Sequence, residues 1–166
     1  MVCTGEQGHK ANYPRHIVVE RDQVLEVRRV LSPSLEDYLE EIYRFSLENS
    51  VVRVTDISKK LGVSLPSVSK ALHKLNNQGY INYRRYGEIV LTDQGCLKGS
   101  YLVERNQMLQ EFLSLIQSQC DIPAETEAIE HYISDSTIQS LRRLITFFKE
   151  NPTCYEAFIR FECDQN

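Results

Sequence analysis

The stretch VRVTDISKKLGVSLPSVSKALHKLNNQGYI, residues 52–81, decides the fold. Thr55 is placed to cap a first short helix, and Gly62 is expected to end it, because glycine adopts left-handed backbone with little steric penalty. Ser64 is placed to cap a second helix, with Pro66 in its first turn. Two short helices joined by a tight glycine turn predict a helix-turn-helix.

The segments on either side extend this unit. Upstream, SPSLEDYLEEIYRFSLEN (residues 32–49) predicts a helix, because it begins with a Ser-Pro start signal and its apolar residues recur at helical spacing. That apolar stripe comprises Leu35, Tyr38, Leu39, Ile42 and Phe45. Downstream, INYRRYGEIVLTDQG predicts a hairpin with strands at 81–85 and 88–92. Three helices followed by a hairpin are typical of a winged helix.

The remainder of the chain reads as helical. A long helix is expected over roughly 94–117, a second opens at Pro123, a third runs from 135 or 136 to about 149, and a last one starts at Asn151-Pro152. The predicted fold is therefore mainly α, with a winged helix-turn-helix domain at 31–94 and an all-α domain at 95–166. Residues 1–30 are expected to form a partly disordered extension, with a short helix in 18–30.

Composition sets broad limits on the class of protein. The chain has 166 residues, of which 42% are hydrophobic and 25% charged, as expected for one compact domain or two small ones sharing a core. No apolar run approaches the roughly 18 residues that span a membrane, and the N-terminus lacks the apolar region of a secretory signal. Five cysteines without CxxC spacing favour free thiols in a reducing cytosol, so a cytoplasmic protein is expected.

The net charge of −4 is unevenly divided along the chain. Residues 53–98 carry eight Lys and Arg against three Asp and Glu, a net charge of +5. Residues 1–52 carry six against nine, a net −3, and residues 99–166 carry five against eleven, a net −6. A basic middle between acidic flanks predicts that the helix-turn-helix segment meets a polyanion.

The second helix of the helix-turn-helix has the small polar residues that suit the DNA major groove. Ser67 and Lys70 are candidates for hydrogen bonds to base edges or phosphates, and Pro66 and Val68 are candidates for contact with a thymine methyl group. Basic side chains on both helices and the wing are expected to contact phosphates and position the module. The predicted DNA-binding residues are Ser64, Pro66, Ser67, Ser69, Lys70, Lys74, Arg84 and Arg85, with Lys59 and Lys60 as further phosphate contacts. The alternative is a protein–protein module with solvated cations.

The stretch ETEAIEHYISD, residues 125–135, carries a candidate metal motif. Glu127, Glu130 and His131 have the spacing that places side chains on one helical face, where they could converge on a cation. The same spacing also fits the solvent-exposed edge of an ordinary amphipathic helix.

A second acidic pair lies in the helix predicted at 32–49. Asp37 and Glu40 also share one helical face, although Asp37 fits a residue favoured by the helix dipole and Glu40 fits an ion pair with Arg44. Carboxylates combined with an imidazole suit Mn²⁺ or Fe²⁺. The sequence does not show whether the two helices meet.

Four segments together resemble the diphtheria toxin repressor family of metal-dependent regulators: PSLEDYLEEIY, IVLTDQG, YLVERNQMLQEFL and AIEHYIS. The resemblance covers about residues 32–150 and is closest to the short manganese transport regulator branch. It implies that the second domain serves dimerisation and metal binding. It also implies metal ligands at Asp37, Glu40, Glu127, Glu130 and His131. Glu127 stands where iron-responsive members have Cys, and a hard oxygen there favours Mn²⁺.

Asn106 departs from the family pattern, because it stands where the resemblance expects a ligand His. An amide oxygen is a poor ligand for most transition metals, although Mn²⁺ or Ca²⁺ accepts it. The metal site is therefore expected to include Asn106 as a weak ligand, to hold one metal instead of two, or to recruit Glu104 or Gln107.

These observations predict a Mn²⁺-responsive, homodimeric repressor that binds a palindromic operator of metal-ion transport genes, with Fe²⁺ or another divalent transition metal as the alternative ion. The alternative function is a winged-helix regulator with an altered metal site that binds DNA without metal. An enzyme is not expected, because the chain shows neither a nucleophile–base pair nor a Gly-rich phosphate loop.

A dimer interface is expected from apolar residues of the long helix and of the helix after 135. These are Leu102, Leu109, Phe112, Leu113, Ile138, Leu141, Leu144 and Phe148. The same residues fit an intrachain core.

Overall fold

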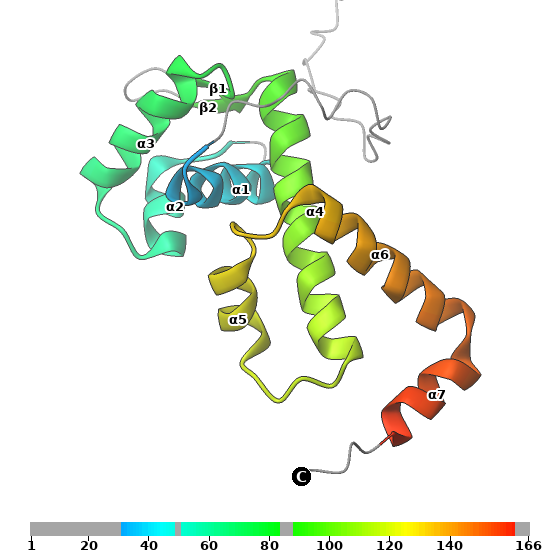
Figure 1. The fold of residues 1–166 in the computed structure, drawn as a ribbon. Helices are drawn as coiled ribbons and strands as arrows, with labels where there is room; N and C mark the ends of the chain where they lie inside the picture. Colours follow the sequence, from blue (N-terminus) through cyan, green and yellow to red (C-terminus); the bar gives the residue numbers. More distant parts are fainter. Residues whose placement is uncertain (1–30, 49–50, 84–87, 162–166) are drawn as a thin grey trace, which may run out of the picture.

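A computed structural model describes residues 31–48, 51–83 and 88–161 of the chain. The helices and strands in chain order are α1 (Pro33–Glu48), α2 (Val54–Leu61), α3 (Leu65–Asn77), β1 (Ile81–Tyr83), β2 (Ile89–Leu91), α4 (Asp93–Leu115), α5 (Ile122–Ile129), α6 (Asp135–Glu150) and α7 (Pro152–Arg160). In Figure 1, α1–α3 and the strands gather around the first half of α4, whereas α5 and α6 lie beside its second half. The mainly α fold predicted from the sequence is confirmed. The helix predicted in 18–30 lies outside the described residues.

The helix-turn-helix forms through the predicted turn. Gly62 ends α2 with a φ of +64°, and its N–H donates to the Ser58 carbonyl. Ser64 precedes α3 in extended backbone, and its Oγ accepts a hydrogen bond from the Ser67 N–H. The prediction that Thr55 caps α2 is wrong. Arg53 is the N-cap residue, because helical bonding begins at its carbonyl, which accepts from the N–H groups of Asp56 and Ile57.

The wing is a short antiparallel hairpin. Ile81 pairs with Leu91 and Tyr83 pairs with Ile89, and buried and exposed residues alternate along both strands. Val52 adds an isolated bridge to Ile89. β2 is shorter than the predicted 88–92, and residues 84–87, which include Arg84 and Arg85, lie outside the described residues.

A large core joins the helix-turn-helix, the wing and α1. Leu39, Ile42, Ile57, Leu72 and Tyr80 are fully buried in it. Leu102 of α4 also belongs to this core, so the first half of α4 is part of the N-terminal unit. A smaller core lies further along α4 and consists of Met108, Leu109, Ile138 and Ile145.

Two glycines let α4 approach the N-terminal unit closely. A Cβ on Gly99 would lie 2.6 Å from the Tyr43 Cβ of α1, and a Cβ on Gly95 would lie 1.8 Å from the Tyr80 carbonyl oxygen. Real carbon atoms do not pack at these distances, so α1 and α4 could not meet this closely with larger residues. This contact sets the position of the acidic residues of α1 against α4.

Among the described residues, no helix has the length and apolar character needed to cross a membrane. The three cysteines within the described ranges, Cys96, Cys120 and Cys154, are free thiols, as predicted.

Candidate metal centre and nucleic-acid interface

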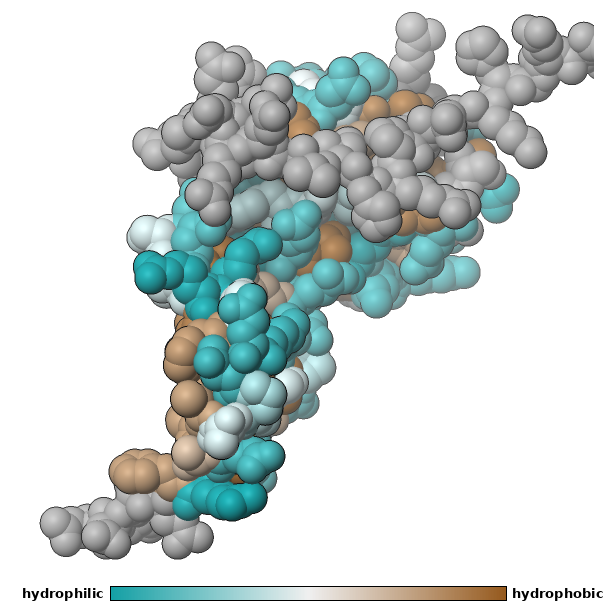
Figure 2. Space-filling view, turned by 90° about the vertical axis from the view of Figure 1, so that its right-hand side faces the viewer, coloured by the Kyte–Doolittle hydropathy of each residue, from teal (hydrophilic) through white to brown (hydrophobic). Residues whose placement is uncertain are grey.

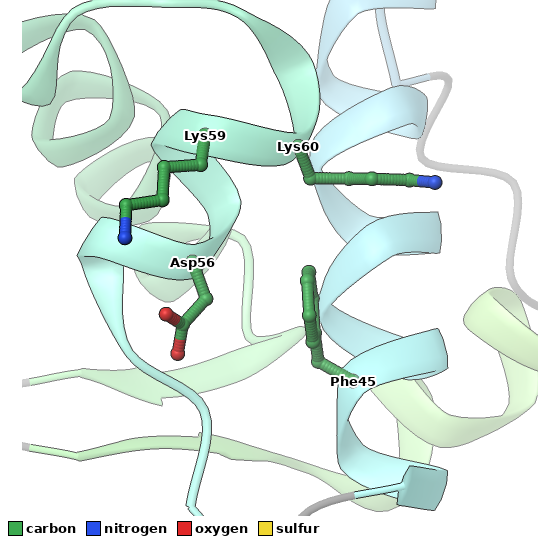
Figure 3. Close-up of a pocket in the computed structure, with 4 residues that line it drawn as sticks. All are labelled: Phe45, Asp56, Lys59 and Lys60. Atoms are coloured by element: carbon green, nitrogen blue, oxygen red, sulfur yellow. The ribbon is translucent and has the colours of Figure 1, made fainter.

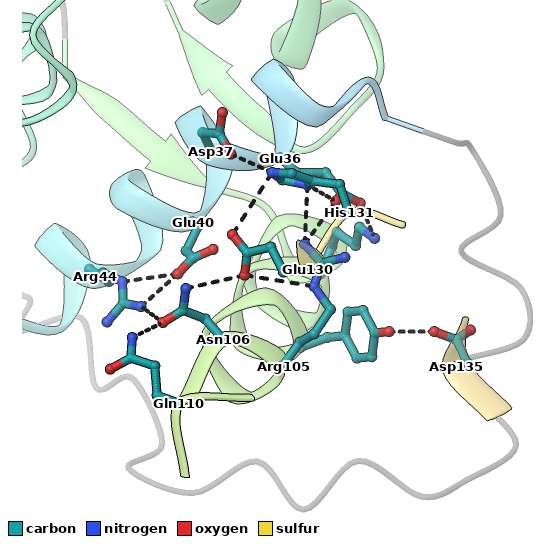
Figure 4. A network of polar contacts seen from close by, with 12 residues as sticks. Glu36, Asp37, Glu40, Arg44, Arg105, Asn106, Gln110, Glu130, His131 and Asp135 are labelled. Carbon is teal, nitrogen blue, oxygen red and sulfur yellow. Dashed lines mark hydrogen bonds and ion pairs between the residues drawn. The ribbon is translucent and has the colours of Figure 1, made fainter. Parts of the chain in front are cut away.

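Asp37, Glu130 and His131 lie together at the junction of the two halves of the molecule. Each offers one potential ligand atom, and these atoms lie within 4.8 Å of one another. The His131 Nε2 is 3.0 Å from the Asp37 Oδ1 and 3.8 Å from the Glu130 Oε1. In Figure 4, Asp37 projects from α1 toward the segment that follows α5. The two helical segments that the sequence left unconnected therefore do meet.

The end of α5 shapes this group. The helix stops at Ile129, so Glu130 is its C-cap residue and His131 lies in the turn beyond it. The prediction that Glu127, Glu130 and His131 share one face of a continuous helix is therefore wrong. Glu127 is an exposed residue of α5 outside the cluster of three, although its charge helps to raise the pKa of Asp37.

Glu36 is a further candidate residue of the site that the sequence did not indicate. Its Oε2 lies 3.0 Å from the His131 Nδ1 and 3.0 Å from the Arg105 Nη2, and its Oε1 lies 2.8 Å from the Lys98 Nζ. A carboxylate only accepts hydrogen bonds, so the His131 Nδ1 carries the hydrogen in this contact. By the same reasoning, the His131 Nε2 is placed to donate to the Asp37 Oδ1 when no metal is bound. A bound metal would take the place of that hydrogen, while the contact of Nδ1 with Glu36 orients the imidazole.

The pKa values of the carboxyl groups divide them into two kinds. Burial raises the pKa of Glu36, but the hydrogen bond and charge of Lys98, together with His131 and Arg105, outweigh it and lower that pKa below its ordinary value. Burial raises the pKa of Glu130, and the nearby charge of Glu40 raises it further. Burial likewise raises the pKa of Asp37. The charged forms of Asp37 and Glu130 are thus poorly compensated, and a bound cation would relieve them.

Asn106 and Glu40 lie on the other side of Glu130. The Asn106 Nδ2 donates to the Glu130 Oε2 at 3.1 Å. Glu40 is buried, and its Oε1 accepts from the Arg44 Nη2 at 2.6 Å, which is the i, i+4 pair considered from the sequence. The possible substitutes lie elsewhere: Glu104 is exposed, with its Oε2 3.7 Å from the Arg142 Nη2, and Gln107 is exposed. Of the predicted ligands, the structure thus gathers three, with Glu40 and Asn106 beside them.

The outer face of α3 is the candidate DNA-reading surface. Val68, Leu72 and Leu75 are buried, so α3 presents its other face to solvent. The prediction that Val68 contacts a thymine methyl group is therefore wrong, because its side chain is fully buried in the core. Pro66, Ser67, Lys70 and Lys74 are exposed, and Ser69 is half-buried. Ser64 is exposed, and its hydroxyl accepts the hydrogen bond that caps α3. Leu65 belongs to the same N-terminal end of α3, is 48% exposed there, and suits contact with a thymine methyl group.

The basic residues of α2 lie beside an open hollow. Phe45, Asp56, Lys59 and Lys60 line it, and Figure 3 shows the two lysine side chains extending in opposite directions. Both lysines are exposed in the last turn of α2. The first helix of a helix-turn-helix crosses the DNA backbone, so these side chains remain candidates for phosphate contact.

The outer side of α6 and α7 carries exposed apolar residues. In Figure 2, apolar side chains gather along one edge of the lower half of the molecule. Leu144, Phe147, Phe158 and Phe161 are the large exposed hydrophobic residues of this region, and we call them the α6–α7 apolar surface. Leu102, Leu109, Leu113 and Ile138 were also expected at a dimer interface, but they are buried inside their own chain. Exposed apolar clusters of this kind commonly mark interaction sites.

A winged helix joined through α4 to a cluster of two carboxylates and an imidazole defines a DNA-binding protein with a candidate metal site. Comparison with known proteins agrees with this class. The model of the iron dependent repressor N-terminal DNA binding domain matches residues 30–89, and the model of the iron dependent repressor metal binding and dimerisation domain matches residues 92–158.

Individual relatives agree. The HTH-type transcriptional regulator MntR of Listeria welshimeri is 36% identical over 132 residues, which are 79% of this chain and 93% of that protein. The protein of the same name from Shouchella clausii is 40% identical over 123 residues, which are 74% of this chain and 86% of that protein.

Two solved structures are also similar. The manganese regulator SloR matches with a TM-score of 0.62 and 27% identity over 70% of this chain. A manganese-dependent transcriptional repressor in complex with manganese matches with a TM-score of 0.61 and 26% identity over 68% of this chain. This chain spans about half the length of these two, 55% and 53% respectively.

The chain belongs to the iron dependent repressor family. The resemblance to the diphtheria toxin repressor family and its manganese regulator branch is thereby confirmed. The chain is a metal-responsive DNA-binding transcriptional repressor and not an enzyme, as predicted.

Proposed function

We propose that this chain is a homodimeric, Mn²⁺-responsive repressor that acts in the cytoplasm on a palindromic operator of metal-ion transport genes. The observation that carries the proposal is the meeting of Asp37 with Glu130 and His131 within 4.8 Å. Asp37 belongs to the domain proposed at 31–94, and the other two belong to the domain proposed at 95–166. A metal bound there would connect the DNA-binding unit to the dimerisation unit.

Asp37, Glu130 and His131 would hold the ion, and Glu40, Glu127 and Asn106, the other predicted ligands, lie outside this group of three. The donor set fits a divalent metal, because the pKa values of the half-buried Asp37 and the buried Glu130 are raised and both carboxylates gain from a cation. Glu36 also presents the His131 Nε2 toward Asp37. Two carboxylates with one imidazole suit Mn²⁺ better than a metal that prefers thiolates. The solved structures of manganese regulators support the same ion.

The proposed mechanism is a shift in population between loose and fixed arrangements. Without metal, burial disfavours the charged forms of Asp37 and Glu130, and the charge of Glu40 adds to this cost at both carboxylates. A bound divalent ion supplies the positive charge that joins α1 to the turn after α5. In a dimer, this joint would fix the two α3 helices at the spacing of successive major grooves of a palindromic operator.

The α6–α7 apolar surface is the proposed dimer interface, which is consistent with the match to a dimerisation domain. The residues proposed to contact DNA are those predicted from the sequence, with Leu65 added at the start of α3. The exposed position of Pro66, Ser67, Lys70 and Lys74 supports this assignment.

Fluorescence anisotropy tests this function. A DNA duplex selected from a random library in the presence of Mn²⁺ is titrated with protein at fixed salt, in Mn²⁺, Fe²⁺, Zn²⁺ or EDTA. The wild type is expected to bind tightly with Mn²⁺ and weakly with EDTA, whereas Glu130→Ala is expected to stay weak in all four. Glu104→Ala, which removes an exposed glutamate of α4 outside the cluster, should behave as the wild type.

The second candidate function is a DNA-binding regulator that works without metal. The pairing of Glu40 with Arg44, together with Asn106 at the position of an expected ligand, favours it. Equal affinity in Mn²⁺ and EDTA for both the wild type and Glu130→Ala would establish this second function and overturn the first.

A further inference from the structure

Arg44 lies at the edge of the metal centre and contacts residues of two helices. Its Nη2 lies 2.6 Å from the Glu40 Oε1, and its Nε lies 3.7 Å from the Glu41 Oε1. Both glutamates belong to α1. It also donates from Nη2 to the Asn106 Oδ1 of α4 at 3.3 Å. Figure 4 shows Arg44 and Glu40 on one side of Glu130 and the Asp37–His131 pair on the other. An ion pair within α1 alone would not also contact α4. Arg44 therefore links α1 to α4 beside the cluster of Asp37, Glu130 and His131.

Asn106 is fully engaged in this network. Its Oδ1 accepts from the Gln110 Nε2 at 2.7 Å in addition to Arg44, and its Nδ2 donates to Glu130. An amide oxygen has two lone pairs, and both face donors here. In this arrangement, Asn106 is a link between the guanidinium and Glu130 and has no lone pair left for a metal.

The carboxylates around the site differ in how closely a Lys or Arg side chain compensates their charge. Glu36 is compensated by Lys98 and Arg105, and Glu40 is compensated by Arg44. Within the described residues, Asp37 forms an ion pair only with His131, and Glu130 has the Arg105 Nε at 4.0 Å, a guanidinium that it shares with Glu36. These two carboxylates are therefore the least compensated, and their two negative charges match one divalent cation. Arginine keeps its charge at all physiological pH values, so this compensation is permanent.

We propose that the guanidinium of Arg44 is a built-in cation that takes the electrostatic role of a second divalent ion at the Glu40–Asn106 side of the centre. This inference rests on the proposed function and specifies its stoichiometry. One Mn²⁺ binds per chain, between Asp37, Glu130 and His131, and Glu40 serves Arg44 and not the metal. The contacts of Arg44 with Glu40 of α1 and Asn106 of α4 then hold the two helices together with or without metal.

Removing the guanidinium and restoring an imidazole should open a second site. The double variant Arg44→Met/Asn106→His frees the Glu40 carboxylate and adds a nitrogen donor on α4. We expect it to bind two Mn²⁺ per chain by isothermal titration calorimetry, with spin coupling between the two ions in its electron paramagnetic resonance spectrum. The wild type should bind one Mn²⁺ with an uncoupled spectrum.

A matched variant separates charge from added ligand. Arg44→Lys/Asn106→His has the same imidazole but keeps a cation, so it should remain at one Mn²⁺. A second Mn²⁺ in the wild type or in this lysine variant would overturn the proposal, and so would a single ion in Arg44→Met/Asn106→His. Circular dichroism establishes that each variant is folded. If the methionine variant does not fold, Glu40→Gln decides: one Mn²⁺ at unchanged affinity supports the proposal, and a tenfold or greater loss contradicts it.

The outcome also distinguishes this inference from the proposed function. Two ions in the wild type, with Mn²⁺-dependent DNA binding retained, would reject the role of Arg44 and leave the repressor function intact. A wild type that binds no Mn²⁺ would reject both.

Discussion

The two halves of the molecule are built with very different amounts of core. The unit formed by α1, the helix-turn-helix, the wing and the start of α4 buries 17 hydrophobic residues in one cluster, whereas the cluster shared by α4 and α6 buries four, within the described residues. The first unit therefore has the interior of an independent domain. The second has little interior and an exposed apolar surface, so its stability depends on what binds to it.

The proposed metal centre lies at the junction between these halves. Glu36 and Asp37 come from the well-packed unit, and Glu130 and His131 follow α5 in the thinly packed one. A ligand at this position connects a rigid element to one that is easily displaced. This difference in packing between the two halves is how, in the proposed function, a small ion can control the placement of a DNA-binding domain.

The largest expected effect comes from matched substitutions in the two cores. Leu72→Ala should lower the free energy of unfolding by about 2–5 kcal/mol, because Leu72 is fully buried among many partners. Ile145→Ala should cost less, because α6 has fewer buried neighbours and can move into the space. Urea unfolding of the metal-free protein measures both. A loss for Ile145→Ala equal to that for Leu72→Ala would show that the two halves are equally well packed.

Metal removal should have the next largest effect. A ligand that binds only the folded state stabilises it by ~2.7 kcal/mol at 100 times its dissociation constant. Mn²⁺ at that concentration should raise the melting temperature of the wild type, and EDTA should reverse the shift. His131→Ala should abolish the shift. His73→Ala, which removes an exposed histidine of α3, should retain it, and loss of the shift in both variants would argue against a site at His131.

The contact between α1 and α4 can be disturbed directly. Gly99→Ala would place a methyl group against Tyr43, so we expect a loss of ~1–3 kcal/mol in stability. Mn²⁺ affinity should fall as well, because Asp37 is carried by the displaced helix. The neighbouring Ser100→Ala serves as the control in the same denaturation and calorimetry experiments. Full Mn²⁺ affinity in a destabilised Gly99→Ala protein would mean that the metal centre does not depend on this contact.

The smallest expected effect concerns association of two chains. Phe147→Asp places a charge on the α6–α7 apolar surface and should weaken the dimer at least about tenfold, or ~1.4 kcal/mol. Sedimentation velocity across a concentration series measures this, with Gln139→Asp, which adds the same single charge at an exposed position of α6, as the control. A dimer unaffected by Phe147→Asp would place the interface elsewhere.

The local structure and the candidate site could be predicted from the sequence to different degrees. Local signals gave the order of the helices and the caps at Gly62 and Ser64, because such signals depend on neighbouring residues. Thr55 was a plausible cap by type, but the N-cap lies two residues earlier, at Arg53, and the helix begins at Val54.

The site was less predictable because tertiary contacts define it. Glu36 has no partner at helical spacing that identifies it, and its contacts with Arg105 and His131 span 69 and 95 residues. The end of α5 at Ile129 turns His131 toward Asp37 and leaves Glu127 exposed, which spacing on an ideal helix does not predict. The resemblance to a known family supplied the pairing of the two acidic segments, which composition and periodicity left open.

Hydrogen–deuterium exchange with and without Mn²⁺ tests most directly whether a metal ion joins the two halves. With Mn²⁺ at about 100 times its dissociation constant, amides in the first turn of α1 and in residues 126–134 should exchange up to about 100-fold more slowly. Amides of α7, which lies away from the cluster, should exchange at unchanged local rates. Protection confined to the α1 turn and the segment after α5 would support the account. Unchanged exchange at both segments, in protein shown to bind Mn²⁺, would contradict it.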